Sequence, residues 1–148
     1  MIGDRLNNYL DYWNKHKEKK PWYWDKIPVE KYLVSGIYCI KIDDVVVYIG
    51  KSVNVHSRIC NHMYNIEKNT QENKYNILRY FSKEGHKISF DLILTEPDEA
   101  MLEIIEKEII ERDRPILNST YNSKLGRGIS IGNVEKYIKD NTPSPLLD

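Results

Sequence analysis

Two short β-branched segments constrain the fold of this 148-residue chain more than any other feature. Residues Ile37 to Ile42 and Val45 to Ile49 are mostly apolar, and Asp43 and Asp44 separate them. Such runs, bounded by turn-forming residues, are typical of paired antiparallel strands. Alternating apolar and polar residues from Lys87 to Leu94 predict a third strand. We therefore expect a small antiparallel sheet built around a hairpin.

Helical segments surround the predicted sheet. Apolar residues recur at helical spacing from Leu6 to Trp13, which predicts an amphipathic N-terminal helix that ends in the segment Lys15 to Lys20. Further helices are predicted from Asn54 to about Glu67, from Asn73 to Glu84, from Pro97 to about Asp113 and from Val134 to Lys139. Thr95 and Asp98 resemble a capping box for the third of these helices. The fold class is therefore α+β, a three-stranded antiparallel sheet flanked by helices, with an extra N-terminal helix.

Composition places the chain among single globular domains. Hydrophobic residues make up 41% and charged residues 30%, within the globular range. The sequence has neither an apolar run long enough to span a bilayer nor a signal-peptide pattern, so we expect an intracellular, cytoplasmic protein without a membrane partner. Cys39 and Cys60 lack metal-site spacing and are expected to be buried thiols.

The net charge of zero argues against a nucleic-acid partner, because Lys and Arg supply most of the affinity for a phosphate backbone. Local charge is uneven, however. Residues 1–34 hold seven bases and five acids, whereas residues 98–114 hold seven acids and three bases. We therefore expect a polarised surface with one basic side.

Glu106 is the most informative single residue. On a helical wheel it lies among Leu102, Ile105 and Ile109, inside the apolar stripe of its predicted helix. A carboxylate buried there requires a cation, because an unpaired buried charge is costly. A bound metal ion and an ordinary ion pair both satisfy that requirement, and the pattern alone does not decide between them.

Arg58 and His62 lie four residues apart, on the same shoulder of another predicted helix, so both can face one site. Arg58 can neutralise a phosphate, and His62 can donate to one or relay a proton near neutral pH. The alternative is a surface arginine whose stem covers the core, beside a semi-buried histidine whose ring nitrogens are already satisfied.

These residues join into one ordered pattern. Gly36-Ile37-Tyr38 and Tyr48-Ile49-Gly50, with nine residues between them, resemble the signature of the GIY-YIG nuclease family. The spacing that follows is also similar to that of the family, with these residues in order: Lys51, Arg58, His62, Glu106, Pro115 and Asn118. On this resemblance, residues 35–120 form a nuclease core, residues 1–34 a helical and aromatic extension, and residues 121–148 a loop, a short helix and a mobile tail.

The resemblance implies hydrolysis of a DNA phosphodiester, most simply in double-stranded DNA, with one Mg²⁺ or Mn²⁺ held by Glu106. Tyr38 is then the candidate general base, with Tyr48 beside it. Lys51 would favour the phenolate, because a free phenol is a poor base near neutral pH. The remaining roles are charge stabilisation by Arg58, a hydrogen bond or proton transfer by His62, and attachment of the Glu106 helix to the sheet by Asn118.

The hairpin turn tests this interpretation. A plain two-residue turn at Asp43 and Asp44 would place Tyr38 and Tyr48 on opposite faces, whereas a longer loop or a β-bulge would set them side by side. If both tyrosines serve one site, we expect the second arrangement.

The flanking segments and the alternative functions stay open at this level. Trp22-Tyr23-Trp24 can stack on bases or cover an edge of the domain, and Arg127 can contact a phosphate together with Lys51 and Arg58 or remain solvated. Self-association would allow both DNA strands to be cut. The competing hypotheses are a GIY-YIG-fold module that binds DNA or protein without cutting, and an unrelated protein in which Arg58 and Glu106 point away from the hairpin.

Overall fold

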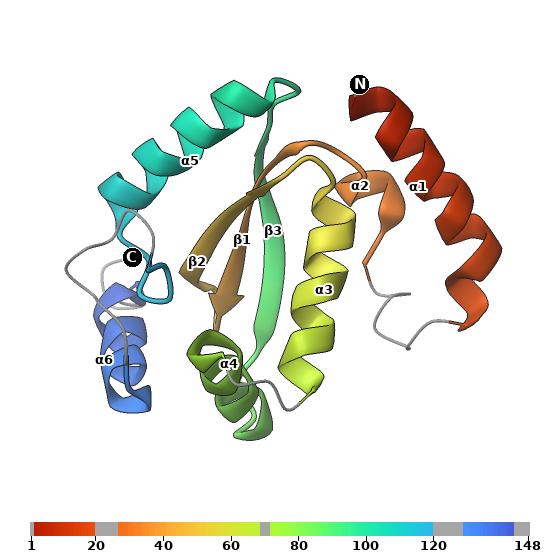
Figure 1. The fold of residues 1–148 in the computed structure, drawn as a ribbon. Helices are drawn as coiled ribbons and strands as arrows, with labels where there is room; N and C mark the ends of the chain where they lie inside the picture. The colour runs from red at the N-terminus through yellow and green to blue at the C-terminus, as the bar shows by residue number, and fades with distance from the viewer. Residues whose placement is uncertain (1, 20–26, 69–71, 120–128, 144–148) are drawn as a thin grey trace.

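A three-stranded antiparallel sheet forms the centre of the protein (Figure 1). The computed structural model describes residues 2–19, 27–68, 72–119 and 129–143. The strands are β1 (Gly36–Ile42), β2 (Val45–Ser52) and β3 (Ile88–Thr95), in the order β2-β1-β3. Strand β1 therefore pairs on both sides, and β2 is an edge strand. The predicted hairpin, the third strand and the α+β class are confirmed.

A β-bulge follows the hairpin turn. Asp43 and Asp44 have φ angles of 50° and 67°, the left-handed region that Asp tolerates better than most residues. Pairing is regular only as far as Lys41 opposite Val46; the next partners are Ile40 and Tyr48. The extra residue restores Tyr48 to the same face of the sheet as Ile40, and hence as Tyr38, because side chains alternate along a strand. The predicted bulge is thus confirmed.

The helices follow the predicted order. They are α1 (Ile2–His16), α2 (Val29–Tyr32), α3 (Val55–Glu67), α4 (Asn73–Lys83), α5 (Glu99–Asp113) and α6 (Ile131–Asn141), with a 3₁₀ turn at Lys17–Lys19. The four-residue α2 was not predicted, because it is too short to show a helical period. Helix α6 is longer than expected, since Ser130 caps it with a capping box to Asn133.

The start of α5 differs from the prediction. Asp98 is not the third residue of a capping box with Thr95. It is itself the N-cap, and its carboxylate accepts from the backbone N–H groups of Ala100 and Met101. Pro97 accordingly precedes the cap instead of lying in the first helical turn. As the N-cap, the Asp98 carboxylate accepts hydrogen bonds from two backbone N–H groups that would otherwise lack partners, which favours this start of the helix over a capping box with Thr95.

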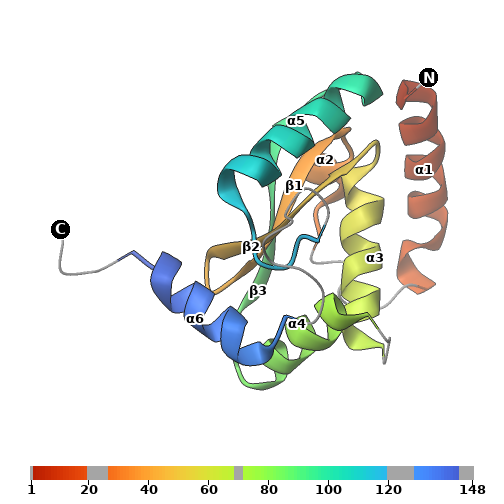
Figure 2. The same ribbon diagram turned by 60° about the vertical axis from the view of Figure 1, so that its left-hand side comes forward.

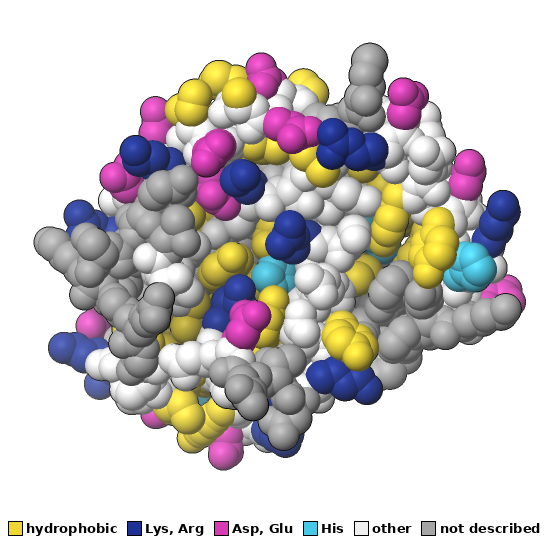
Figure 3. Space-filling view, viewed as in Figure 1, with side chains coloured by type: hydrophobic (Ala, Val, Ile, Leu, Met, Phe, Trp, Pro, Cys, Tyr) yellow, Lys and Arg dark blue, Asp and Glu magenta, His cyan; other side chains and the backbone are white. Residues whose placement is uncertain are grey.

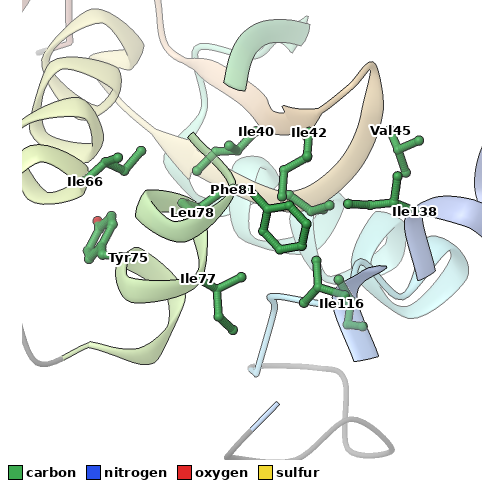
Figure 4. Packing of buried hydrophobic residues seen from close by; sticks show 12 residues of the cluster. Ile40, Ile42, Val45, Ile66, Tyr75, Ile77, Leu78, Phe81, Ile116 and Ile138 are labelled. Carbon is green, nitrogen blue, oxygen red and sulfur yellow. The ribbon is translucent and has the colours of Figure 1, made fainter. Parts of the chain in front are cut away.

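Helices cover both faces of the sheet (Figure 2). Helix α5 packs on one face, where Leu102 and Ile110 meet Ile37, Cys39 and Ile49. Helices α3 and α4 cover the other face. Figure 4 shows the core on that side, where Phe81 and Leu78 of α4 meet the strand residues, and Ile116 and Ile138 close the far end. Both cysteines are buried and free, as predicted.

Helix α1 lies outside α3 and is attached to it through a buried histidine (Figure 1). His56 Nε2 lies 3.1 Å from the carbonyl oxygen of Ile27, so this nitrogen donates. The other nitrogen, Nδ1, then accepts from the Tyr9 hydroxyl at 2.7 Å, and the Trp13 ring packs edge-on against the imidazole. No helix in the described ranges is long and apolar enough to cross a membrane.

Surface charge is unevenly distributed on the face seen in Figure 3. Acidic side chains gather over α5, along the top of the view, while Lys and Arg side chains and a histidine lie nearer its centre. The acidic side chains over α5 agree with the excess of acids in residues 98–114, and the basic side expected from residues 1–34 stays a prediction.

Candidate active site

The outer edge of β2 positions several residues of the candidate site. Ile49 directs its N–H and C=O away from β1, and the Asn118 side chain bonds both of them at 2.8 Å. The same backbone direction recurs two residues later in an antiparallel strand. At that position the backbone N–H of Lys51 faces the carboxylate of Glu106 and acts to lower its pKa. The edge strand is thereby bonded to Asn118, which follows the end of α5, and it lies beside Glu106 in the middle of that helix.

Tyr38 and Tyr48 lie together on the face covered by α3 and α4. Their ring centroids are 6.5 Å apart. Tyr38 pairs directly with Gly50, and a Cβ at residue 50 would lie only 2.5 Å from the Tyr38 hydroxyl oxygen. Because Gly50 has no side chain, it leaves space for the Tyr38 hydroxyl. The last residues of the two tripeptides are therefore required together for steric reasons.

His62 links this pair to α4. Its Nε2 lies 2.5 Å from the Tyr38 hydroxyl, and its Nδ1 lies 2.7 Å from the Tyr75 hydroxyl. The edge of the Tyr48 ring system packs against the imidazole at 5.6 Å, and Phe90 stacks on it at 6.4 Å. His62 is 2% exposed, so it is more deeply buried than its place on the helix predicted.

Burial shifts the proton affinities of these rings. Burial, together with the positive charges of Lys74 and Arg58, lowers the pKa of His62 to about 3, so the imidazole is neutral. Burial raises the pKa of Tyr48 to about 12, and it raises the pKa of Tyr38 still further above the usual range. Arg58 acts against this shift in both tyrosines. The phenols are therefore protonated in the free protein.

The cations of the site are divided between its two sides. Lys51 was expected to favour the Tyr38 phenolate, but its ammonium acts on Glu106, whereas the guanidinium of Arg58 acts on both tyrosines. The reason is the strand alternation: Lys51 pairs with Ile37, on the α5 face, one residue away from the tyrosine face. Arg58 itself is exposed on α3, so its guanidinium is accessible to a phosphate.

Glu106 is half-buried, and burial raises its pKa, while Lys51 and Arg58 act in the opposite direction. The predicted need for a neighbouring cation is confirmed. Within the described residues no group of three or more His, Cys, Asp or Glu side chains is arranged to hold a metal ion. A divalent ion at Glu106 would therefore take one carboxylate from that side chain and fill its remaining positions with water and phosphate oxygens, which suits Mg²⁺.

The structure thus brings together Tyr38, Tyr48, Lys51, Arg58, His62, Glu106 and Asn118. The hypothesis of a coincidental motif required Arg58 and Glu106 to point away from the hairpin, and it is wrong, since both act electrostatically on Tyr38. Arg127 and Trp22-Tyr23-Trp24 lie outside the described residues, so the phosphate contact of Arg127 and the packing or stacking role of the aromatic segment stay predictions.

Two residues of the site, Lys74 and Tyr75, were not predicted from the sequence. Lys74 places its ammonium 4.3 Å from the centre of the Tyr48 ring, and Tyr75 bonds His62. Both come from the first turn of α4, and Tyr75 is part of the core cluster in Figure 4. In the sequence they resemble a solvated lysine and a core aromatic. Predicting their role would require the angle at which α4 packs on α3, and the spacing of residues in the sequence does not give that angle.

The comparisons with known proteins concern the fold. No protein-family model matches the chain, and no curated protein matches it. Among solved structures, a point mutant of bacteriophage T4 EndoII is similar over 57% of this chain and 74% of its own, with 28% identity and a TM-score of 0.47. The GIY-YIG N-terminal endonuclease domain of UvrC from Thermotoga maritima, bound to its catalytic magnesium, is similar over 65% of this chain and 96% of its own, with 21% identity and a TM-score of 0.41.

The chain has a GIY-YIG nuclease-like fold, as its motifs predicted, with a three-stranded antiparallel sheet flanked by helices. At these TM-scores the similarities carry no argument about activity. That argument depends on the residues and the geometry of the site in this chain.

Proposed function

We propose that this protein is a metal-dependent DNA endonuclease that hydrolyses phosphodiester bonds at the edge of β2. One observation carries the proposal: the β-bulge places Tyr38 and Tyr48 on one face with His62, while Glu106 lies near enough to act electrostatically on both tyrosines and to be acted on by Lys51 and Arg58. A buried proton-transfer group and a carboxylate suited to a metal ion thus lie close to the same strand edge. Packing alone does not require this combination.

A divalent cation, Mg²⁺ or Mn²⁺, would be held by Glu106 and would supply Lewis-acid stabilisation of charge on the phosphate. The fit is supported by a half-buried carboxylate whose pKa is raised by burial and lowered by the neighbouring positive charges of Lys51 and Arg58. The exposed Arg58 would bind a phosphate oxygen of the DNA backbone and stabilise the charge that develops there. Lys51, exposed beside Glu106, would make a second phosphate contact.

Tyr38 is the proposed general base for the attacking water. Its hydroxyl is within hydrogen-bond distance of His62 and within electrostatic range of Arg58, and both can favour the phenolate over the phenol. Tyr48 borders the same space from β2. Asn118 is proposed to have a structural role, because the oxygen and the nitrogen of its side-chain amide both bond to the Ile49 backbone and hold the strand edge in place.

The proposed substrate is double-stranded DNA inside the cell. A single site cuts one strand at a time, so a double-strand break would require two successive cuts or two associated chains. Supercoiled plasmid distinguishes these cases, because nicked, linear and intact forms separate on a gel.

The test incubates the purified protein with supercoiled plasmid in Mg²⁺, in Mn²⁺ and in EDTA, with Arg58→Ala in parallel. We expect cleavage in either metal, no cleavage in EDTA, and a rate at least about tenfold lower for Arg58→Ala. DNA binding without cleavage in any condition would favour the alternative function, a silent GIY-YIG-fold binding module. Equal cleavage in EDTA would refute the metal requirement.

A further inference from the structure

Lys74 is a half-buried cation that has no anionic partner within the described part of the chain. Its ammonium lies over two aromatic rings, 4.3 Å from the centre of Tyr48 and 4.7 Å from the centre of Tyr75. Among the described residues it forms no ion pair, and no acceptor holds its N–H groups. Ring faces compensate a cation only in part, and a charge removed from water without a partner is costly. This position therefore favours the binding of an anion.

The charges around Lys74 favour the same ligand. Burial lowers the pKa of the ammonium, while Glu72 acts to raise it and Arg58 acts to lower it. Glu72 is exposed and makes no ion pair with Lys74, so its carboxylate does not neutralise the ammonium. Lys74 and Arg58 therefore repel each other across the contact of α4 with α3. An anion close to both cations would remove this repulsion.

The Tyr48 ring connects Lys74 to the candidate active site. The centre of this ring lies 5.6 Å from that of His62 and 6.5 Å from that of Tyr38, and the Lys74 ammonium faces the same ring. Figure 3 shows Lys and Arg side chains gathered around a histidine near the centre of this face of the molecule. The ammonium is thus next to the catalytic residues, on the side that α4 forms.

The start of α4 is held in place, so the Lys74 ammonium is positioned before any ligand binds. The Asn73 side chain donates to the carbonyl oxygen of Ile129 at 2.9 Å. Further along the helix, Arg79 donates to the carbonyl oxygens of Ile66 and Asn65 at 2.7 and 3.0 Å, which joins α4 to the end of α3. A side chain restrained in this way loses less conformational entropy when it binds a ligand than a mobile surface lysine does.

We propose that Lys74 forms a phosphate subsite: its ammonium contacts a backbone phosphate of the DNA on the α4 side of Tyr48, next to the phosphate that Arg58 binds. The identity of the ligand rests on the proposed function, because the phosphate belongs to the substrate of the same site. The cleaved strand then crosses the Tyr48 ring from α3 to α4. A lysine binds phosphate as a point charge, so this contact positions the strand without reading its sequence.

The alternative is a structural lysine that packs on aromatic rings and stays hydrated. The salt dependence of DNA binding distinguishes the two roles, because each phosphate neutralised by a cation adds about 0.9 to the slope of log K against log salt concentration. We would measure binding of a short duplex by fluorescence anisotropy in EDTA, so that the DNA stays intact, between about 50 and 200 mM salt.

Lys74→Met removes the charge and keeps an unbranched apolar stem over the rings. We expect the slope to fall by about 1 and the affinity at about 0.1 M salt to fall roughly five- to tenfold. Lys74→Gln is the second neutral variant if methionine at this position prevents folding. Lys74→Arg restores a cation, so we expect it to restore the slope. An unchanged slope in the neutral variants would overturn the proposal.

Lys68→Met is the matched control. The Lys68 ammonium lies 5.5 Å from the centre of the Tyr64 ring, a similar contact between two exposed residues at the far end of α3. We expect its slope to equal that of the wild type. An equal fall in Lys68→Met and Lys74→Met would reveal a general charge effect and contradict a subsite at Lys74.

The proposed function can fail separately from this inference. The slope is measured without cleavage, so a wild-type protein that binds DNA but does not cut it would contradict the nuclease activity and leave the subsite supported. Normal plasmid cleavage by Lys74→Met with an unchanged slope would contradict the subsite alone. Where the protein cuts, we expect Lys74→Met to raise KM about fivefold and to leave kcat within about twofold, as for a contact made equally before and during the reaction.

Discussion

At the scale of single residues, His62 shows how burial defines a chemical role. An exposed histidine changes charge near neutral pH, but this imidazole lies between two phenols and near two cations, and its pKa is lowered to about 3. It is therefore a neutral hydrogen-bonding group at physiological pH. A role as an imidazolium donor to phosphate, one of the alternatives that the sequence left open, does not fit this environment.

This burial predicts a pH dependence of stability. The folded-state pKa lies below the unfolded value of about 6.5, so only the unfolded chain takes a proton at His62 as the pH falls between these values. His62 should therefore cost the native state about 2 kcal/mol between pH 6.5 and pH 5. Urea unfolding of the wild type and of His62→Gln at both pH values measures this difference. An equal pH dependence in the two proteins would show that the imidazole is not neutral when buried.

The sequence identified Glu106 and Arg58 because each is unusual in its local pattern, a carboxylate in an apolar stripe and a cation on the shoulder of another. Tyr75 and Lys74 have no such local signal. Their role depends on where α4 begins relative to α3, and that position is set by long-range contacts such as those of Arg79. Residues of this kind become visible only in three dimensions.

At the scale of elements, the β1–β2 hairpin brings the two sequence motifs together, because its bulge places Tyr38 and Tyr48 on one face of the sheet. The periodic patterns were sufficient to predict the strands and the main helices, because most of them bury one regular face. The bulge could be predicted only as a condition for the two tyrosines to meet. Turn residues Asp43 and Asp44 are compatible with a regular hairpin, so they do not by themselves predict the register shift between Ile40 and Lys41.

Gly50 offers a test of the hairpin geometry. In Gly50→Ala, the added methyl group would lie 2.5 Å from the Tyr38 hydroxyl oxygen and displace it from His62. We expect cleavage to fall about a hundredfold, the effect of a displacement near 1 Å in a catalytic group. Gly132→Ala is the control, since its new methyl group would lie 3.8 Å from Ser130. Equal activity of the two variants in the plasmid assay would refute the role assigned to the Tyr38 position.

The edge of β2 offers a second test. Asn118→Ala removes two hydrogen bonds of 2.8 Å and leaves the N–H and C=O of Ile49 unpaired beneath α5. The expected loss in the free energy of unfolding is about 2 to 4 kcal/mol, as for two unsatisfied buried groups. Ser119→Ala, at the exposed neighbouring position, should change stability little. Urea denaturation measures both, and an unchanged Asn118→Ala would show that the clamp is dispensable.

At the scale of the whole molecule, the neutral net charge is reconciled with a DNA substrate by the separation of charges. Acidic side chains gather over α5 (Figure 3). Arg58 and Lys51 are exposed, and both act electrostatically on Glu106. Phosphate contacts would then be local to the cleavage site. The extra helix α1 is part of the same folded body, since its Tyr9 and Trp13 pack on the buried His56 of α3.

The most direct measurement compares Glu106→Ala with Glu108→Ala, an exposed carboxylate on the same helix, in plasmid cleavage with Mg²⁺ and in DNA binding. If Glu106 holds the metal ion, its replacement should reduce cleavage at least about a hundredfold and leave binding within about threefold, because Arg58 and Lys51 remain. Glu108→Ala should cut at the wild-type rate. Cleavage by Glu106→Ala at the wild-type rate would contradict the assignment of the active site.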